Sequence, residues 1–232
     1  MLSDSDGPNE PPLFEETIGQ NLWRTVERFA EREALVVPHQ RYRATYRELW
    51  DQADIAARAL LANHVRKGDR VGVCAPERYE WVVMQFATAR AGAILVDLNS
   101  AETPAELEYA LSDARVSLFM TLESGRGGCR PELPEPIVLE RDWDTFLAQG
   151  ACIGELALTD REAALHPLDP IYIRYAPTAC GPPDKATLSH RDVLDNGRRV
   201  AHNLRSTAIA AERCPALYGM SSPPRTVLGS RP

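Results

Sequence analysis

Apolar residues recur along this chain with a helical period in some stretches and an alternating period in others, which predicts helices and strands in turn. Thr17 precedes a stretch with one apolar helical stripe, and we expect it to cap a helix there. Thr45 and Glu48 form a capping box at the start of a longer helix, whose alanines would let another element pack close. Between these helices, residues 34–37 and 41–44 are expected to pair as a hairpin.

The middle of the chain alternates strand and helix patterns with short connections. Apolar runs at 70–74, 93–98 and 116–121 predict three buried strands. The stretch 77–90 predicts a helix after the first strand, and Thr103 opens another helix after the second. Strands separated by helices of this length form parallel sheets, so this part predicts an α/β fold with a parallel sheet flanked by helices.

The pattern weakens on either side of this region. After the third strand we expect only a short strand at 137–139 and a short helix at 142–148. Residues 1–12 are polar and hold three prolines, which predicts a disordered tail, and residues 206–232 lack a sustained period, which predicts an irregular tail. The chain therefore divides into these two tails and a domain over 13–205.

Composition narrows the class of protein. The net charge is −7, which argues against a nucleic-acid partner. The five cysteines show no C-x-x-C pair, and the first residues, MLSDSDGPNEPP, lack the basic and apolar regions of a signal peptide. No run approaches the roughly 20 apolar residues that a membrane span needs. We expect a reduced, cytoplasmic protein without a membrane span.

Residues 171–197 carry the strongest candidate chemistry: a short apolar strand, a loop of small residues, and a helix opened by Ser189. A strand that runs into such a loop often brings backbone N–H groups to a phosphate. The stretch resembles the phosphate loop of the AMP-forming acyl-CoA synthetases of the adenylate-forming superfamily. Their pattern is Tyr-Thr-Ser-Gly-Thr-Thr-Gly-x-Pro-Lys-Gly, followed by Leu-Ser-His-Arg-Asn. The matching residues are Tyr175, Gly181, Pro183, Leu188, Ser189, His190 and Arg191.

Earlier segments add to this resemblance by their order and spacing. Residues 67–71 read KGDRV, residues 91–93 read AGA, and Asn99 is followed by TPAEL at 103–107, as in the N-terminal half of the family. The resemblance covers roughly residues 14–197. It implies a partial N-terminal subdomain of the adenylate-forming fold that lacks the C-terminal domain.

The resemblance also implies cofactors, substrates and a binding site. ATP and Mg²⁺ would be held at the loop, and the candidate binding residues are Thr178, Cys180, Gly181 and, one residue after the position of the family's lysine, Lys185. A carboxylic acid, in this family most often a fatty acid, would be converted to an acyl-adenylate and then to a thioester with CoA. The resemblance therefore implies a fatty-acid–CoA ligase.

The loop departs from the family pattern at several positions. Thr178 stands where the family has a glycine that allows close phosphate approach, and Pro177 removes a backbone donor. Asp184 stands where the family has lysine and would repel a polyphosphate, although Lys185 follows at once. Two interpretations stay open: a one-residue shift makes Lys185 the loop cation, or the segment is a surface loop that no longer binds a ligand.

Neither a catalytic residue nor a metal ligand is assigned. The family's catalytic lysine belongs to a C-terminal domain, and Lys67 and Lys185 are the only lysines in this sequence. We therefore expect a truncated and catalytically impaired ligase. It would keep some nucleotide binding, with another chain supplying the rest, or remain as a non-catalytic acyl- or partner-binding protein.

An unrelated Rossmann-type nucleotide-binding domain is a further alternative. This alternative is disfavoured because the turn between the first strand and the next helix contains Pro76 and lacks the glycines of the Rossmann fold. A partial parallel sheet would expose an apolar face or edge. We therefore expect marginal stability, with self-association or a partner chain at that edge.

Overall fold

The computed structural model describes residues 15–75, 78–98, 103–123, 135–176 and 183–206. The chain divides into two compact units, residues 1–191 and 192–232. The first unit holds the sheets and all helices up to the start of α7, which runs from His190 to Ser206. In the second unit the described residues form the remainder of α7, where Arg198 Nη2 donates to Asp195 Oδ1 at 2.7 Å.

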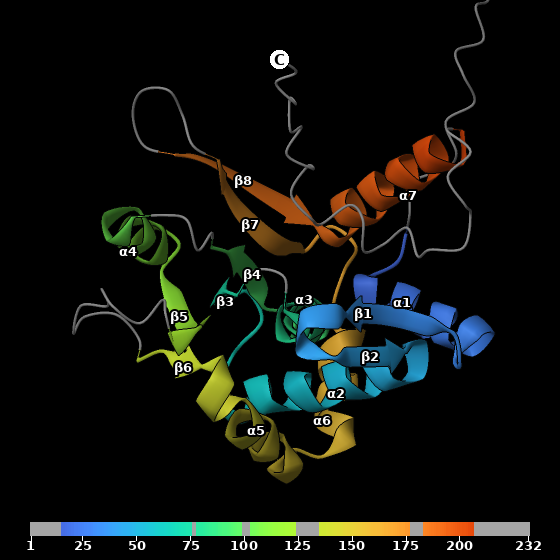
Figure 1. Ribbon diagram of the computed structural model, residues 1–232, viewed down its shortest axis with the longest axis horizontal. Coiled ribbons are helices and arrows are strands. Elements are labelled where there is room, and N and C mark those ends of the chain that lie inside the picture. Colours follow the sequence, from blue (N-terminus) through green and yellow to red (C-terminus); the bar gives the residue numbers. More distant parts are fainter. Residues whose placement is uncertain (1–14, 76–77, 99–102, 124–134, 177–182, 207–232) are drawn as a thin grey trace, which may run out of the picture. The chain divides into compact units, whose positions relative to one another are not determined.

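A six-stranded sheet forms the centre of the first unit, with the order β6-β5-β3-β4-β7-β8 (Figure 1). Its first five strands in this order are parallel, and β8 runs antiparallel to β7. The strands are β3 (Arg70–Cys74), β4 (Ile94–Asp97), β5 (Val116–Thr121), β6 (Ile137–Val138), β7 (Pro170–Ala176) and β8 (Asp184–Ser189). The predicted α/β architecture with a parallel sheet flanked by helices is confirmed, and β8 makes the sheet mixed.

The helices begin close to the predicted caps. The side chains of Thr17, Thr45 and Thr103 each accept a hydrogen bond from the third helical N–H. The side chain at that third position in turn accepts a hydrogen bond from the backbone N–H of the threonine. The helices of the first unit are α1 (Ile18–Phe29), α2 (Tyr46–Ala62), α3 (Tyr79–Ala91), α4 (Pro104–Asp113), α5 (Leu139–Gln149) and α6 (Glu155–Ala163). None of the described helices is both long and apolar enough to cross a membrane.

Two short elements complete the first unit. The predicted hairpin is present as β1 (Glu33–Val37) and β2 (Tyr42–Thr45), which pair antiparallel around a 3₁₀ turn at Pro38–Gln40. A second 3₁₀ turn, η3 (Gly150–Cys152), follows α5. The hairpin stays separate from the six-stranded sheet.

Helices cover both faces of the sheet at its central strands, whereas β8 is mostly exposed. Helix α4 packs on one face through Ala110 and Leu111, against strand residues that include Val96 and Phe119. Helix α3 lies against β4 and contacts α1, α2 and α6 on its other sides, so residues 83–91 are all buried. A helix buried on all sides needs no polar face, and α3 accordingly lacks an apolar stripe.

Helix α2 packs unusually close to the turn after α5, as its alanines predict. Ala53, Ala56 and Ala59 are fully buried in α2. A Cβ added at Gly150 would lie 2.7 Å from the carbonyl oxygen of Ile55 and 2.9 Å from the amide nitrogen of Ala59. Both neighbours are backbone atoms, so no side chain can move aside to make room.

Replacing Gly150 with alanine is therefore expected to lower the free energy of unfolding by about 2 kcal/mol through overpacking. The backbone at Gly150 is right-handed helical, so the loss comes from the clash and not from strain. Gly154→Ala is the matched control, because nothing lies within 4 Å of a Cβ added there. Urea unfolding of both variants tests this, and equal stabilities would contradict the proposed close packing.

Candidate functional site

The parallel strands bring several chain connections to one edge of the sheet. The carboxyl ends of β3, β4 and β7 share this edge because the three strands run parallel. The predicted phosphate loop follows β7 and therefore begins there, where ligands bind in open α/β sheets. Thr178, Cys180 and Gly181 lie outside the described residues, and the described part of the site consists of the strands and helices that flank them in the sequence and the fold.

The hairpin of β7 and β8 fixes where the loop begins and ends. Tyr175 pairs with Lys185 and Ala176 pairs with Asp184 across the two strands. The sequence predicted a loop that runs directly into a helix, and this is wrong for residues 184–189, which form β8. The antiparallel ladder, which is regular from Tyr172 to Ala176, satisfies backbone groups that a loop would leave to solvent, and it sets Lys185 at a defined position of the sheet.

Lys185 is held by an acid from helix α4. Its Nζ donates to Asp113 Oδ2 at 2.9 Å, and the Tyr175 hydroxyl donates to the same oxygen at 2.6 Å. Lys185 Nζ also lies 5.9 Å from the centroid of the Tyr175 ring. The hydrogen bonds from Tyr175 and Lys185 hold the pKa of Asp113 below its usual range. In this arrangement the candidate loop cation is neutralised by Asp113.

A second polar group joins the last residue of β4, Asp97, to Tyr172 in β7. The Tyr172 hydroxyl donates to Asp97 Oδ2 at 2.6 Å. Burial raises the pKa of Asp97, opposed by the hydrogen bonds from Tyr172 and Trp81 and by the charge of Arg174. Burial and the Asp97 charge likewise raise the pKa of Tyr172. This pair was not predicted from the sequence, although a carboxylate at the end of an apolar strand was a signal that could have pointed to Asp97.

His190 lies where β8 passes into α7 and is fully buried. Its Nδ1 accepts a hydrogen bond from the backbone N–H of Ile18 at 3.1 Å, and its Nε2 finds no partner among the described residues. Burial lowers the pKa of His190 to about 4, with Asp169 acting to raise it and Lys67 to lower it. The sequence identified His190 only as part of a motif, and the structure shows it joining the β7–β8 hairpin to the start of α1.

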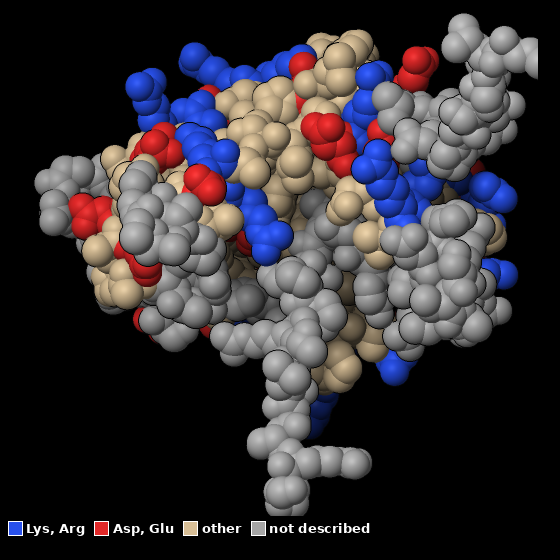
Figure 2. Space-filling view, turned by 90° about the horizontal axis from the view of Figure 1, so that it is seen from above, with Lys and Arg blue, Asp and Glu red and all other residues tan. Residues whose placement is uncertain are grey.

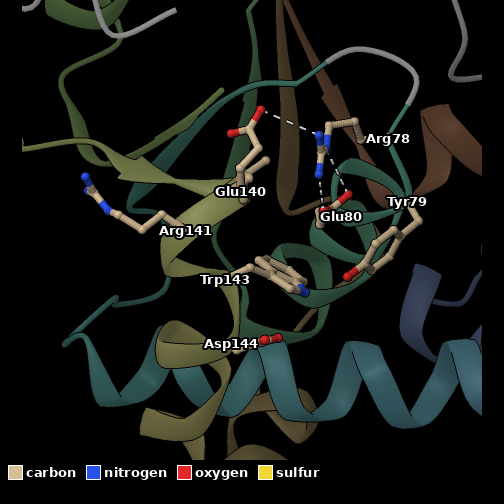
Figure 3. Close-up of a pocket in the computed structure, with 8 residues that line it drawn as sticks. Arg78, Tyr79, Glu80, Glu140, Arg141, Trp143 and Asp144 are labelled. Carbon is tan, nitrogen blue, oxygen red and sulfur yellow. Dashed lines mark hydrogen bonds and ion pairs between the residues drawn. The ribbon is translucent and has the colours of Figure 1, made fainter. Parts of the chain in front are cut away.

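A shallow pocket of about 180 Å³ opens between the starts of α3 and α5 (Figure 3). Arg78 Nη2 lies 2.7 Å from Glu80 Oε1, and Arg78 Nη1 lies 3.6 Å from Glu140 Oε1. Trp143 forms an apolar wall, and burial raises the pKa of Tyr79 to about 12. Because the guanidinium of Arg78 is already paired with two carboxylates, this pocket offers no obvious anion site.

Charges of both signs are mixed on the surface. In the face shown in Figure 2, Lys and Arg side chains predominate, with Asp and Glu side chains scattered among them. Within the described ranges, no group of three or more His, Cys, Asp or Glu side chains has an arrangement that could hold a metal ion. The chemistry of the described site therefore centres on Lys185, Asp113 and Asp97.

The fold and the described part of the site define an α/β domain in which the connection between β7 and β8 begins at the carboxyl ends of the parallel strands. Residues 22–222 match the AMP-binding enzyme family, so the chain belongs to that family. In structure it is similar to the N-terminal subdomain of Klebsiella oxytoca NpsA in complex with 3-hydroxyanthranilyl-AMSN. The TM-score is 0.64 at 21% identity, over 80% of this chain and 44% of that one, which supports the fold alone.

Curated relatives agree with this family. The chain is 35% identical to the acyl-CoA ligase sidI of Aspergillus fumigatus, over 93% of this chain and 40% of the relative. It is 32% identical to the mitochondrial medium-chain acyl-CoA ligase ACSF2 of Rattus norvegicus, over 95% of this chain and 42% of the relative. The chain thus spans about two fifths of the length of these relatives. The predicted resemblance to AMP-forming acyl-CoA synthetases is confirmed.

Proposed function

We propose that this chain takes part in the ATP-dependent activation of a carboxylic acid. The acid's carboxylate attacks the α-phosphate of ATP, which gives an acyl-adenylate and releases pyrophosphate. The CoA thiol then displaces AMP to give a thioester. Family membership and relatives named acyl-CoA ligases support this reaction class. The observation that supports particular residues is the pairing of β7 with β8, in which Lys185 lies opposite Tyr175, two residues before the predicted phosphate loop begins.

The described residues beside the loop allow a partial test of fit to the triphosphate. They offer one ammonium group, Lys185, with the carboxylate of Asp113 bound to it and Asp184 next to it in β8. For this set to bind a triphosphate, the ammonium must turn from Asp113 to a phosphate oxygen, and the charge of Asp184 opposes the binding. We propose that Lys185 then holds the phosphates together with Thr178, Cys180 and Gly181. Bound Mg²⁺ would supply further neutralisation of phosphate charge.

Finer features of the proposal come from the family and its relatives. We propose a fatty acid as the substrate, a CoA thioester as the product, and residues 13–205 as the domain concerned. The rat relative is named a medium-chain ligase and mitochondrial. We propose a cytoplasmic location for this chain, and cell fractionation with an antibody to it decides between the cytosol and mitochondria.

A non-catalytic role is the second candidate function. The departures at Pro177, Thr178 and Asp184 favour it, because each weakens a phosphate loop. In that case the chain would bind an acyl group or another chain without turnover. The edge strand β8, which is mostly exposed, would be the place for pairing with another strand. Light scattering over a range of concentrations tests self-association, and a monomer throughout would rule it out. The Rossmann-type alternative is excluded by the family match.

Removing the charge of Lys185 is expected to weaken MgATP binding about tenfold, which corresponds to the loss of one hydrogen bond to a charged group. Lys185→Met keeps most of the aliphatic stem, and Lys185→Arg keeps a cation and is expected to bind MgATP like the wild-type chain. Isothermal titration gives the affinities. Equal affinity for the Met variant would show that Lys185 does not contact the nucleotide.

The reaction itself is tested by mixing the purified chain with ATP, Mg²⁺ and a panel of carboxylic acids, and by seeking acyl-AMP by mass spectrometry. Acyl-AMP that disappears in Lys185→Met supports the proposal. ATP binding without acyl-AMP would limit this chain to nucleotide binding. A folded chain that neither binds ATP nor forms acyl-AMP would overturn the proposal and leave the non-catalytic role.

A further inference from the structure

The ammonium group of Lys185 cannot form a full-strength ion pair with a phosphate and with Asp113 at the same time. The ladder between β7 and β8 fixes the backbone of Lys185 opposite Tyr175. Its side chain is a flexible four-carbon stem that is 37% exposed, so the ammonium can change partner without any movement of the strand. In the structure the ammonium forms an ion pair with Asp113 Oδ2 at 2.9 Å.

Asp113 occupies an unusual position for an acid. It is the last residue of α4, where the negative end of the helix disfavours a carboxylate. Two donors, the Tyr175 hydroxyl and the Lys185 ammonium, converge on one of its oxygens. Asp113 is therefore stabilised by the hairpin and not by its own helix.

The Tyr175 hydroxyl makes an exchange of partners inexpensive. When Lys185 leaves, Asp113 keeps the 2.6 Å hydrogen bond from Tyr175 and stays 36% exposed to water. The carboxylate is then neither buried nor unsatisfied, so its loss of Lys185 costs little. An exposed ion pair of this kind is typically worth about 0.2–1 kcal/mol.

We propose that Asp113 is a competitor for the ammonium of Lys185, which the triphosphate of the nucleotide must displace when it binds. This inference rests on the proposed nucleotide-binding function and adds its regulation. A triphosphate carries several negative charges and outcompetes a single carboxylate, whereas a weakly charged anion does not. Asp113 thereby lowers by the same factor the affinity for every anion that must take the ammonium of Lys185 from it.

Removing the competing charge is expected to tighten MgATP binding. Asp113→Asn keeps the size and shape of the side chain and can still accept a hydrogen bond from Tyr175. We expect the MgATP affinity of this variant to rise by roughly 1.4- to 5-fold, which corresponds to the free energy that an exposed ion pair typically contributes. The gain should shrink at high salt. Asp160→Asn, at an exposed position of α6, makes the same change in net charge and should leave the affinity unchanged. In a Lys185→Met background, Asp113→Asn should also have no effect.

The scarcity of lysine allows a direct view of the exchange. With ¹³C-lysine labelling, the chain gives side-chain NMR signals from Lys67 and Lys185 alone. Lys67 is held by Asp169 at 2.7 Å and serves as the internal reference. We expect MgATP to shift the Lys185 signal and not that of Lys67. Asp113→Asn should shift Lys185 before MgATP is added, and both proteins should reach a similar MgATP-bound position.

The outcomes separate this inference from the proposed function. If the wild-type chain does not bind MgATP, both the proposed function and this inference fail. If the wild-type chain binds MgATP and Lys185→Met weakens the binding, the proposed function stands. The proposed competition is then wrong if Asp113→Asn leaves the MgATP affinity unchanged, or if it changes the affinity equally in the Lys185→Met background. A Lys185 signal that MgATP does not move would also overturn the competition.

Discussion

Replacing Arg90 with alanine is expected to lower the free energy of unfolding by about 3 kcal/mol, the cost of breaking a buried ion pair by removing one partner. Arg90 is 2% exposed in the last turn of α3. Its Nε contacts Glu162 Oε1 of α6 at 2.5 Å and its Nη2 contacts Asp54 Oδ1 of α2 at 2.9 Å. Its guanidinium carbon lies 3.7 Å from the centroid of the Trp50 ring. One side chain thus joins three helices by charge and by aromatic contact.

Further variants separate lost charge from lost volume. Arg90→Met keeps the aliphatic stem and is expected to lose a similar amount, because Glu162 is then left without its cation. Asp54 keeps Arg58 at 2.9 Å. Adding Glu162→Gln to Arg90→Met should recover about 1 kcal/mol, since no unpaired carboxylate then remains there. Urea unfolding measures all three. If Glu162→Gln lowers stability further in the Arg90→Met background, the account of the ion pair is wrong.

Stability is expected to fall by about 3 kcal/mol between pH 7 and pH 4 through His190 alone. Burial lowers the pKa of His190 to about 4, whereas the unfolded chain has the ordinary value of about 6.5. The unfolded state therefore takes up the proton first as the pH falls. The stabilisation by neutral His190 is fully present above about pH 6.5 and is lost as the pH approaches 4.

The contribution of His190 is separated from that of other groups by a variant. Asp113 and Asp169 also have a lowered pKa, so their ionised forms likewise lose stabilising interactions in acid. In His190→Asn the amide oxygen can replace Nδ1 as acceptor for the N–H of Ile18 without a group that titrates in this range. Urea unfolding from pH 7 to pH 4 should give a shallower decline for this variant. A decline equal to that of the wild-type chain would show that His190 does not titrate on unfolding.

The sequence predicted most of the architecture because the relevant signals are local. The capping boxes at Thr17, Thr45 and Thr103 and the apolar runs of β3, β4 and β5 each lie within a few residues of the element they define. Helix α6 was missed because it buries only Leu158 and therefore shows no apolar stripe. Strand β8 was missed because its six residues are mostly exposed and follow a turn-rich segment. Its pairing depends on β7, which its own sequence does not reveal.

The site could be predicted only as a segment and not as a set of contacts. The phosphate-loop motif located Lys185, but nothing near it in the sequence points to Asp113, which lies 72 residues away. Tyr172 and Asp97 are 75 residues apart in the same way. Both pairs arise from the strand order, which brings β4 beside β7 and α4 over the same region. For this reason the ion pair between Lys185 and Asp113 could not be predicted from the sequence.

The hydrogen bond between Ile18 and His190 joins residues 172 positions apart. At ordinary rates of translation, roughly 10–30 s separate the synthesis of these two residues. Helix α1 carries its own cap and can begin to form early, but its fixed place against the hairpin has to wait for His190 to emerge. A nascent chain arrested before His190 should therefore leave the start of α1 open to proteases and chaperones, and one arrested well after it should not.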